Sequence, residues 1–149
     1  MVEPRPRRRR PPASRPAAIR LRRAVNWVNL ATPLGLLAAK LGHAQLRRGE
    51  FGLIIASGYR GFLPVSGRAM TIGDVVLLGI DEERLAHRPH LLRHEARHAG
   101  QYARWLGPLG FLPAYGLASA WSKWHTGNPA LRNGFEVAAD LHEGGYTSS

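Results

Sequence analysis

Hydrophobic residues recur at helical spacing early in the chain, between about Ile19 and Arg48. A spacing of roughly three to four residues places them on one face of a helix, as in segments that pack on a core. Proline lacks a backbone N–H and interrupts helical hydrogen bonding, so we expect a bend or a division near Pro33. The pattern predicts one or two helices, built on Ile19, Val25, Val28, Leu30, Leu34, Leu37 and Leu41.

Two short apolar runs follow, Phe51 to Ser57 and Asp74 to Ile80. They are rich in Ile, Val and Leu and are separated by Gly, Pro and Ser, which predicts two strands. Gly73-Asp74 fits a turn at the entry to the second strand, and residues 61–69 are a candidate third strand. We expect a small antiparallel hairpin or part of a three-stranded sheet.

From Asp81 onward the pattern is helical. Pro89 suits a first helical turn, whereas Gly107 suits a C-terminal cap and Pro108 cannot continue the helix, which predicts a helix over residues 88–106. Two more helices are expected over residues 112–124 and 134–142. The sequence therefore predicts an α+β fold with a small antiparallel sheet packed on a helical C-terminal half.

The length and charge of the chain add a domain organisation. The 149 residues suit one domain, and nine arginines in the first 23 positions carry most of the net charge of +11. We expect residues 1–18 to be a disordered Arg- and Pro-rich tail and residues 19–149 to be a single domain. The tail could make weak contact with an anionic membrane or with nucleic acid, although it has no aromatic residue for base stacking.

The absence of cysteine excludes a disulfide scaffold, a thiolate metal site and a cysteine nucleophile. No uninterrupted apolar run reaches the roughly 18 to 20 residues of a membrane helix. The basic start and the apolar residues 25–39 match a secretory leader poorly, because two asparagines and a proline interrupt them. We therefore expect a cytoplasmic protein, with membrane association through the tail and the tryptophans of residues 105–124 as the alternative.

The most informative motif is His94-Glu95-Ala96-Arg97-His98, inside the first helix of the C-terminal half. Residues four apart lie one turn apart on the same face, so both imidazoles can bind one ion while Glu95 projects beside it. A zinc ion (Zn²⁺) held in this way activates a water molecule, and the adjacent carboxylate accepts its proton. A surface helix that happens to bear two histidines is the alternative.

A zinc hydrolase needs a third protein ligand. Glu136 is the best candidate, because it shares a helix face with Asp140, which could accept the free N–H of a ligand histidine. However, Asn133 and Glu136 also match a capping box, so Glu136 could simply cap its helix. The other candidate ligands are His90, His125 and His142. Tyr115, Tyr146, His125 and His142 are candidates to stabilise the oxyanion.

HExxH followed by the ExxxD of Glu136 and Asp140 resembles the gluzincin branch of the zincin metallopeptidases. In that family a downstream Glu is the third zinc ligand and the Asp supports a ligand histidine. The stretches from His94 to Gln101 and from Gly107 to Tyr115 are also similar to short bacterial HExxH proteins of unknown function. The resemblance implies a minimal zincin-like fold.

The resemblance also implies a function, a peptidase that binds zinc through His94, His98 and Glu136, with Glu95 as base. Among the candidates for the oxyanion, we take Tyr115 as the further catalytic residue. The substrate would be a peptide or protein, added as a strand along residues 74–80, which we expect at a sheet edge. The alternative is a non-catalytic zinc-binding or membrane-associated protein with a basic tail.

Overall fold

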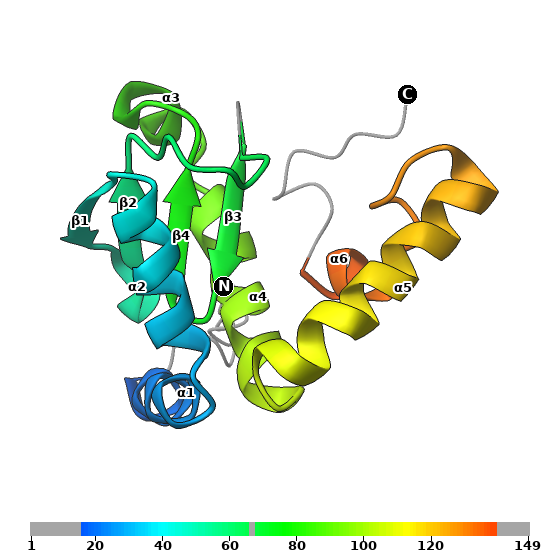
Figure 1. Ribbon diagram of the computed structural model, residues 1–149, viewed down its shortest axis with the longest axis horizontal. Helices are drawn as coiled ribbons and strands as arrows, with labels where there is room; N and C mark the ends of the chain where they lie inside the picture. Colours follow the sequence, from blue (N-terminus) through cyan, green and yellow to red (C-terminus); the bar gives the residue numbers. More distant parts are fainter. Residues whose placement is uncertain (1–15, 66–67, 140–149) are drawn as a thin grey trace, which may run out of the picture.

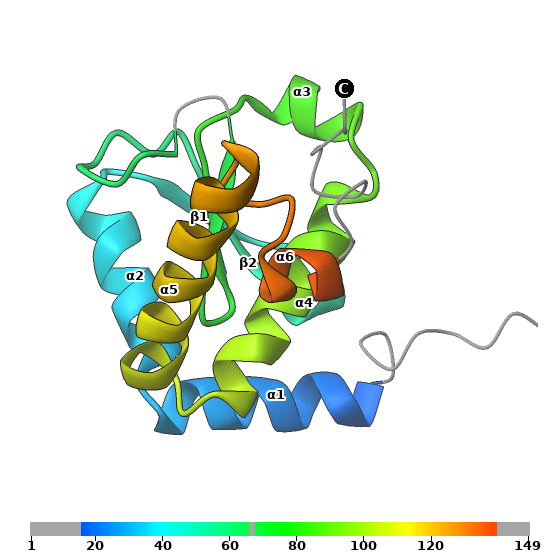
Figure 2. The ribbon, with the colours of Figure 1, turned by 90° about the vertical axis from the view of Figure 1, so that its right-hand side faces the viewer.

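The computed structural model describes residues 16–65 and 68–139, and these form an α+β fold, as the sequence predicted. Figures 1 and 2 show a small sheet with helices on both sides. The elements in chain order are α1 (Pro16–Val28), α2 (Ala31–Leu41), β1 (Gln45–Arg48), the 3-10 turn η2 (Glu50–Gly52), β2 (Ile54–Ser57), β3 (Ala69–Ile72), β4 (Val75–Leu78), α3 (Glu82–Ala86), α4 (Leu91–Arg104), α5 (Pro108–Thr126) and α6 (Gly134–Ala139).

The sheet is mixed rather than antiparallel, which corrects one detail of the expected fold. Its strand order is β1-β2-β4-β3, and β2 runs parallel to β4. The turn at Gly73, where φ is 63°, reverses β3 into β4 as predicted. The two predicted strands, β2 and β4, are neighbours but run parallel, with β3 between them in the chain, so they do not form a hairpin with each other. Strand β1 was not predicted from the sequence, because QLRR has a single apolar residue and all four residues are exposed at the sheet edge.

Two helices cover the two faces of the sheet (Figure 1). In β4, Val75 and Leu77 pack in one cluster with Ala31, Ala38 and Ala39 of α2. The alternate residues Val76 and Leu78 pack in the other cluster with Leu91, Ala96 and Ala99 of α4. All four β4 residues are buried, which explains why the strand is apolar throughout.

The predicted helices are present with different ends. The division between α1 and α2 falls at Asn29 and Leu30, so Pro33 lies in the first turn of α2, where its missing N–H has no helical partner to lose. Helix α5 begins at Pro108 rather than at residue 112 and contains Pro113. Helix α1 begins at Pro16, and residues 1–15 of the predicted tail lie outside the described residues. Within the described ranges, no helix is both long and apolar enough to cross a membrane.

The buried carboxylate of Asp74 connects the N-terminal helices to the sheet. Asp74 Oδ1 accepts hydrogen bonds from Arg22 Nε at 2.9 Å and Asn26 Nδ2 at 3.2 Å, and Oδ2 accepts one from Thr32 Oγ1 at 3.1 Å. Asn26 Nδ2 also donates to the carbonyl of Ala99 in α4 at 3.0 Å. The carboxylate of Asp74 thus holds α1 and α2 on the β3–β4 turn. Its partner Asn26 also connects α1 to α4.

We predict that Asp74→Ala strongly destabilises the fold, because it leaves the buried guanidinium of Arg22 without its counter-charge. Breaking a buried ion pair on one side costs about 3–5 kcal/mol of unfolding free energy. Urea denaturation followed by circular dichroism would measure the loss.

The matched control is Arg47→Ala, which removes the exposed ion pair between Arg47 Nε and Glu82 Oε1. Exposed pairs are screened by solvent and contribute little, so this variant should unfold as the wild type does. If both variants lost a similar free energy of unfolding, the buried Asp74 network would contribute no more to stability than an exposed ion pair.

Candidate metal site

Helix α4 presents different residues to the sheet and to the site. Leu91, Ala96 and Ala99 pack against the sheet. His94 and His98, one helical turn apart, lie on another face and are nevertheless buried. Because both the apolar and the polar residues recur at helical spacing, the sequence places the two imidazoles in register.

Glu136 reaches the histidines from helix α6. The preceding residue, Phe135, packs against three aromatic rings, those of Trp105 at 5.2 Å, Phe111 at 5.3 Å and Tyr115 at 6.1 Å between centroids. The carbonyl of Phe135 also accepts a hydrogen bond from Gln101 Nε2 at 2.8 Å. This packing fixes the start of α6 on α4 and α5, and it positions the carboxylate that follows.

The three side chains bring their ligand atoms to one point. The distances are 3.0 Å between the two histidine Nε2 atoms, 3.3 Å from His94 Nε2 to Glu136 Oε2, and 3.4 Å from His98 Nε2 to Glu136 Oε1. Zinc bonds nitrogen and oxygen ligands at about 2.0–2.2 Å, so the edges of its coordination tetrahedron are about 3.3–3.6 Å. Two of the three separations match such edges, and the third is slightly shorter.

The other nitrogen of each ring is held by an acceptor. His94 Nδ1 lies 2.9 Å from the carbonyl of Ala139, which can only accept. His98 Nδ1 lies 2.8 Å from Gln101 Oε1, the amide oxygen, since Gln101 Nε2 donates to Phe135. Both Nδ1 atoms therefore carry protons and both Nε2 atoms point their lone pairs into the cluster, the tautomer and orientation that metal ligation requires.

The cluster needs a cation. Burial of Glu136 raises its pKa, but the two adjacent imidazoles and the hydrogen bond from Tyr115 together lower it by more, so the pKa lies well below the ordinary value. With neutral rings, two lone pairs and this carboxylate face one another at 3.0–3.4 Å. Glu136 Oε2 is buried without a hydrogen-bond partner among the described residues. Either protons or a metal ion must lie between these atoms, and the residues fit a divalent metal.

Glu95 is held beside the ligand pair by the edge strand β3. Its side chain is buried, and Oε2 accepts a hydrogen bond from Thr71 Oγ1 at 2.6 Å. Thr71 pairs in register with Val76, which also faces α4. The base proposed from the sequence is therefore anchored in one orientation rather than free on the helix surface.

The structure also places the other predicted site residues. The Tyr115 hydroxyl is at the cluster and donates to Glu136 Oε1. Asn133 Oδ1 caps α6 by accepting from the N–H of Phe135, while the Glu136 carboxylate turns to the histidines instead of closing a capping box. Asp140, proposed to support a ligand, lies outside the described residues, as do His142 and Tyr146.

The remaining histidines that were considered are elsewhere. His90 is exposed at the start of α4 beside Arg93, and His125 is near the end of α5 against Trp121 and Trp124. Across residues 16–65 and 68–139, His94, His98 and Glu136 are the one group of three side chains arranged to hold a metal.

Three supporting groups were not predicted. Gln101 follows His98 by three residues on α4, so helical spacing alone could have indicated it. The carbonyl of Ala139 accepts from His94 and also from Arg97 Nη1 at 2.8 Å, and a backbone group of this kind has no sequence signal. Thr71 comes from a strand 24 residues before Glu95, and no local pattern connects the two.

Comparison with known proteins finds no match for this chain among family models, curated proteins or solved structures.

We predict that the purified protein binds about one zinc ion per chain and that Glu136→Ala loses it. Losing a residue that supports a metal ligand typically costs 10–100-fold in metal affinity, so loss of the ligand itself should cost more than about a hundredfold. Elemental mass spectrometry and competition with a chelating dye would measure the content and the affinity.

Gln101→Met is a graded comparison, because it leaves all three ligands but removes the acceptor for His98 Nδ1 and the donor to the Phe135 carbonyl. Its affinity should fall by about 10–100-fold. Zinc binding that is unchanged in Glu136→Ala would mean that the ion binds elsewhere. The cluster would then be a protonated polar network and not a metal site.

Proposed function

We propose that this protein is a zinc-dependent peptidase. The observation that supports the proposal is the convergence of His94 Nε2, His98 Nε2 and the Glu136 carboxylate within 3.4 Å of one another, with Glu95 next to them on the same helix. Three protein ligands leave one position of a tetrahedral zinc site open for water, as in catalytic rather than structural sites. The similarity of the HExxH and ExxxD motifs to gluzincins is consistent with this function.

In this proposal Glu95 is the general base. A bound zinc ion would supply Lewis acidity, lowering the pKa of a water molecule and polarising the scissile carbonyl. Glu95 accepts a proton from the attacking water and passes it to the nitrogen of the leaving amine, so the amide bond breaks as the carboxylate product forms. Thr71 holds Oε2 of Glu95 during both transfers.

Tyr115 is the candidate to stabilise the oxyanion, and it has a second role in the structure. Its hydroxyl donates to Glu136 Oε1, so it orients the third ligand before substrate binds. To donate to an oxyanion, the hydroxyl would have to turn away from that carboxylate. Loss of Tyr115 would therefore affect both metal affinity and turnover.

An extended peptide is the proposed substrate, bound along β3. The strand expected at the sheet edge, β4, lies between β2 and β3, which corrects the predicted docking strand. β3 is at the edge nearest to α5 and α6 (Figure 1), and its Thr71 contacts the base. A peptide added to this edge would place a carbonyl near Glu95.

The cytoplasmic location expected from the sequence stays part of the proposal, and cell fractionation would test it.

We predict that Glu95→Gln keeps zinc and loses peptide hydrolysis. The amide is close in shape to the carboxylate but cannot accept a proton, and general base catalysis contributes typically 10²–10⁴-fold. A quenched-fluorescent peptide library, assayed beside metal analysis, would measure both. A non-catalytic zinc protein would show no hydrolysis in either form, and equal hydrolysis in both would exclude Glu95 as the base.

We predict that Thr71→Val lowers kcat by roughly tenfold while zinc content and KM stay unchanged, because a hydrogen bond to a charged group contributes about 1.5–3 kcal/mol. The measurement is steady-state kinetics on the best library substrate. Thr71→Ser retains the hydroxyl and should restore kcat. If the serine variant is as slow as the valine variant, the strand packing matters and the hydrogen bond does not.

A further inference from the structure

One end of the molecule combines two exposed corners of the chain. Figures 1 and 2 both show α1 and the connection between α4 and α5 at this end, with α3 at the opposite end. The two corners are joined directly, since Asn29 Nδ2 donates to the carbonyl of Tyr102 at 3.2 Å. A Cβ on Gly107, where φ is 71°, would lie 2.7 Å from the Asn29 carbonyl oxygen. We call this end the basal face.

The basal face exposes large apolar side chains. They are Trp27, Val28 and Leu30 at the α1–α2 corner and Trp105, Leu106 and Leu109 at the α4–α5 corner. Val28, Leu106 and Leu109 are 84%, 82% and 90% exposed. Apolar residues gathered in this way on one face are typical of an interaction site, whereas single exposed residues are common on any protein.

The backbone at both corners is strained in a way that packing does not explain. Leu30 and Leu106 have φ of 66° and 60°, in the left-handed region that favours glycine. A leucine there costs free energy, and neither side chain recovers it by burial, since they are 65% and 82% exposed. At both corners the chain therefore exposes a leucine where glycine would be the less strained residue.

Exposed basic residues lie at and beside the basal face. Helix α1 has no acidic residue, and its Arg20 and Arg23 are exposed. Arg104, also exposed, ends α4 next to the second corner. The acidic residues Asp81 and Glu82 lie at the start of α3 at the opposite end, where each pairs with an arginine. An anionic surface would therefore attract the basal face.

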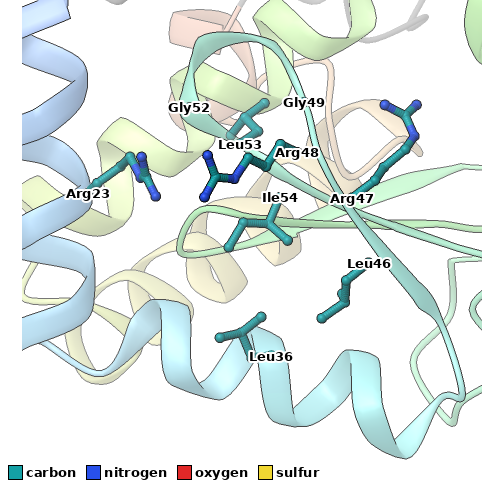
Figure 3. A pocket seen from close by; sticks show the side chains of 9 residues that line it. All are labelled: Arg23, Leu36, Leu46, Arg47, Arg48, Gly49, Gly52, Leu53 and Ile54. Atoms are coloured by element: carbon teal, nitrogen blue, oxygen red, sulfur yellow. The ribbon is translucent and has the colours of Figure 1, made fainter.

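A pair of arginines at the side of α1 provides a place for an anionic group. Figure 3 shows the guanidinium groups of Arg23 and Arg48 pointing toward each other, with Leu36 and Ile54 among the apolar residues below them. The pocket has a volume of about 450 Å³, and no acidic residue lines it. Neither arginine forms an ion pair among the described residues. A phosphate between two guanidinium groups would make charge-assisted hydrogen bonds to both.

We propose that the basal face docks on an anionic lipid bilayer. Trp27, Val28, Leu30, Leu106 and Leu109 enter the boundary between headgroups and acyl chains, where Trp is favoured, and the exposed part of Trp105, whose ring also packs on Phe135, borders it. Arg20 and Arg23 of α1 lie in the headgroup layer, with Arg23 and Arg48 on a lipid phosphate. Docking needs no membrane-spanning helix, and it does not depend on the proposed peptidase activity.

The test uses full-length protein carrying W121F/W124F, which leaves Trp27 and Trp105 as its only tryptophans. Vesicles of phosphatidylcholine with 30% phosphatidylglycerol (roughly the charge of an anionic leaflet) are compared with pure phosphatidylcholine. A lipid brominated in its acyl chains quenches tryptophans that enter the bilayer. We expect binding to the anionic vesicles with a blue-shifted and quenched emission.

The decisive variant is L30G/L106G, because glycine suits both backbone conformations and the fold should be kept or stabilised. Burial of a leucine contributes about 1.5–3 kcal/mol, so partial insertion of two should make vesicle affinity at least about tenfold weaker. R23Q/R48Q should also bind more weakly by about tenfold or more, at about 1 kcal/mol per basic residue. The control Leu117→Ser, on α5 away from the corner, should bind as the parent does.

Two results would overturn the proposal. In the first, the protein binds vesicles without quenching of its tryptophans, and L30G/L106G binds with the same affinity. Electrostatic attraction of the arginine-rich tail alone would then hold the protein on the vesicle. The second is a dimer of the parent that L30G/L106G converts to a monomer in light scattering, with no quenching by lipid. The basal face would then be an interface between copies of the chain.

Discussion

The arrangement of this fold depends on one buried carboxylate. Asp74 is almost fully buried, and removing a charge from water is costly, so it is compatible with the fold only while its partners stay in place. Those partners, Arg22, Asn26 and Thr32, come from the two N-terminal helices. Asn26 also bonds the carbonyl of Ala99, one residue after the ligand His98. The hydrogen bonds of Asp74 and Asn26 thereby fix the position of helix α4, which carries the two histidines of the candidate metal site.

The site itself is assembled from three segments that meet only in the folded chain. Helix α4 supplies both histidines and Glu95, α6 supplies Glu136, and β3 supplies the hydroxyl that holds the base. Each ligand has its own support, because aromatic packing at Phe135 places the carboxylate and separate acceptors orient the two rings. Contacts within the protein thus position each of these groups independently of any bond to a metal ion.

Local patterns predicted the parts of the site that one helix can encode. Spacing within α4 identified His94 and His98 as a pair, and a second helical pattern indicated Glu136, although the sequence could not separate a ligand from a capping box. The carboxylate lies buried against both rings and does not close a capping box, so it could hold a metal ion together with them. Thr71 and the mixed sheet were not predictable in this way, because both depend on β3 crossing to the far side of β4, a long-range pairing without a local signal.

The position of α4 also connects the site with the basal face. His98 and Trp105 are seven positions apart, and since a helix rises 1.5 Å per residue, they are separated by roughly 10 Å along the axis. If the basal face docks on a bilayer, the metal site therefore lies within about two helical turns of α4, roughly 10 Å along its axis, from residues at the lipid boundary. A peptide that reaches β3 would then be an extended segment close to the membrane surface. The contact of Asn26 with Ala99 fixes α1 on α4 and hence the orientation of the site toward that surface.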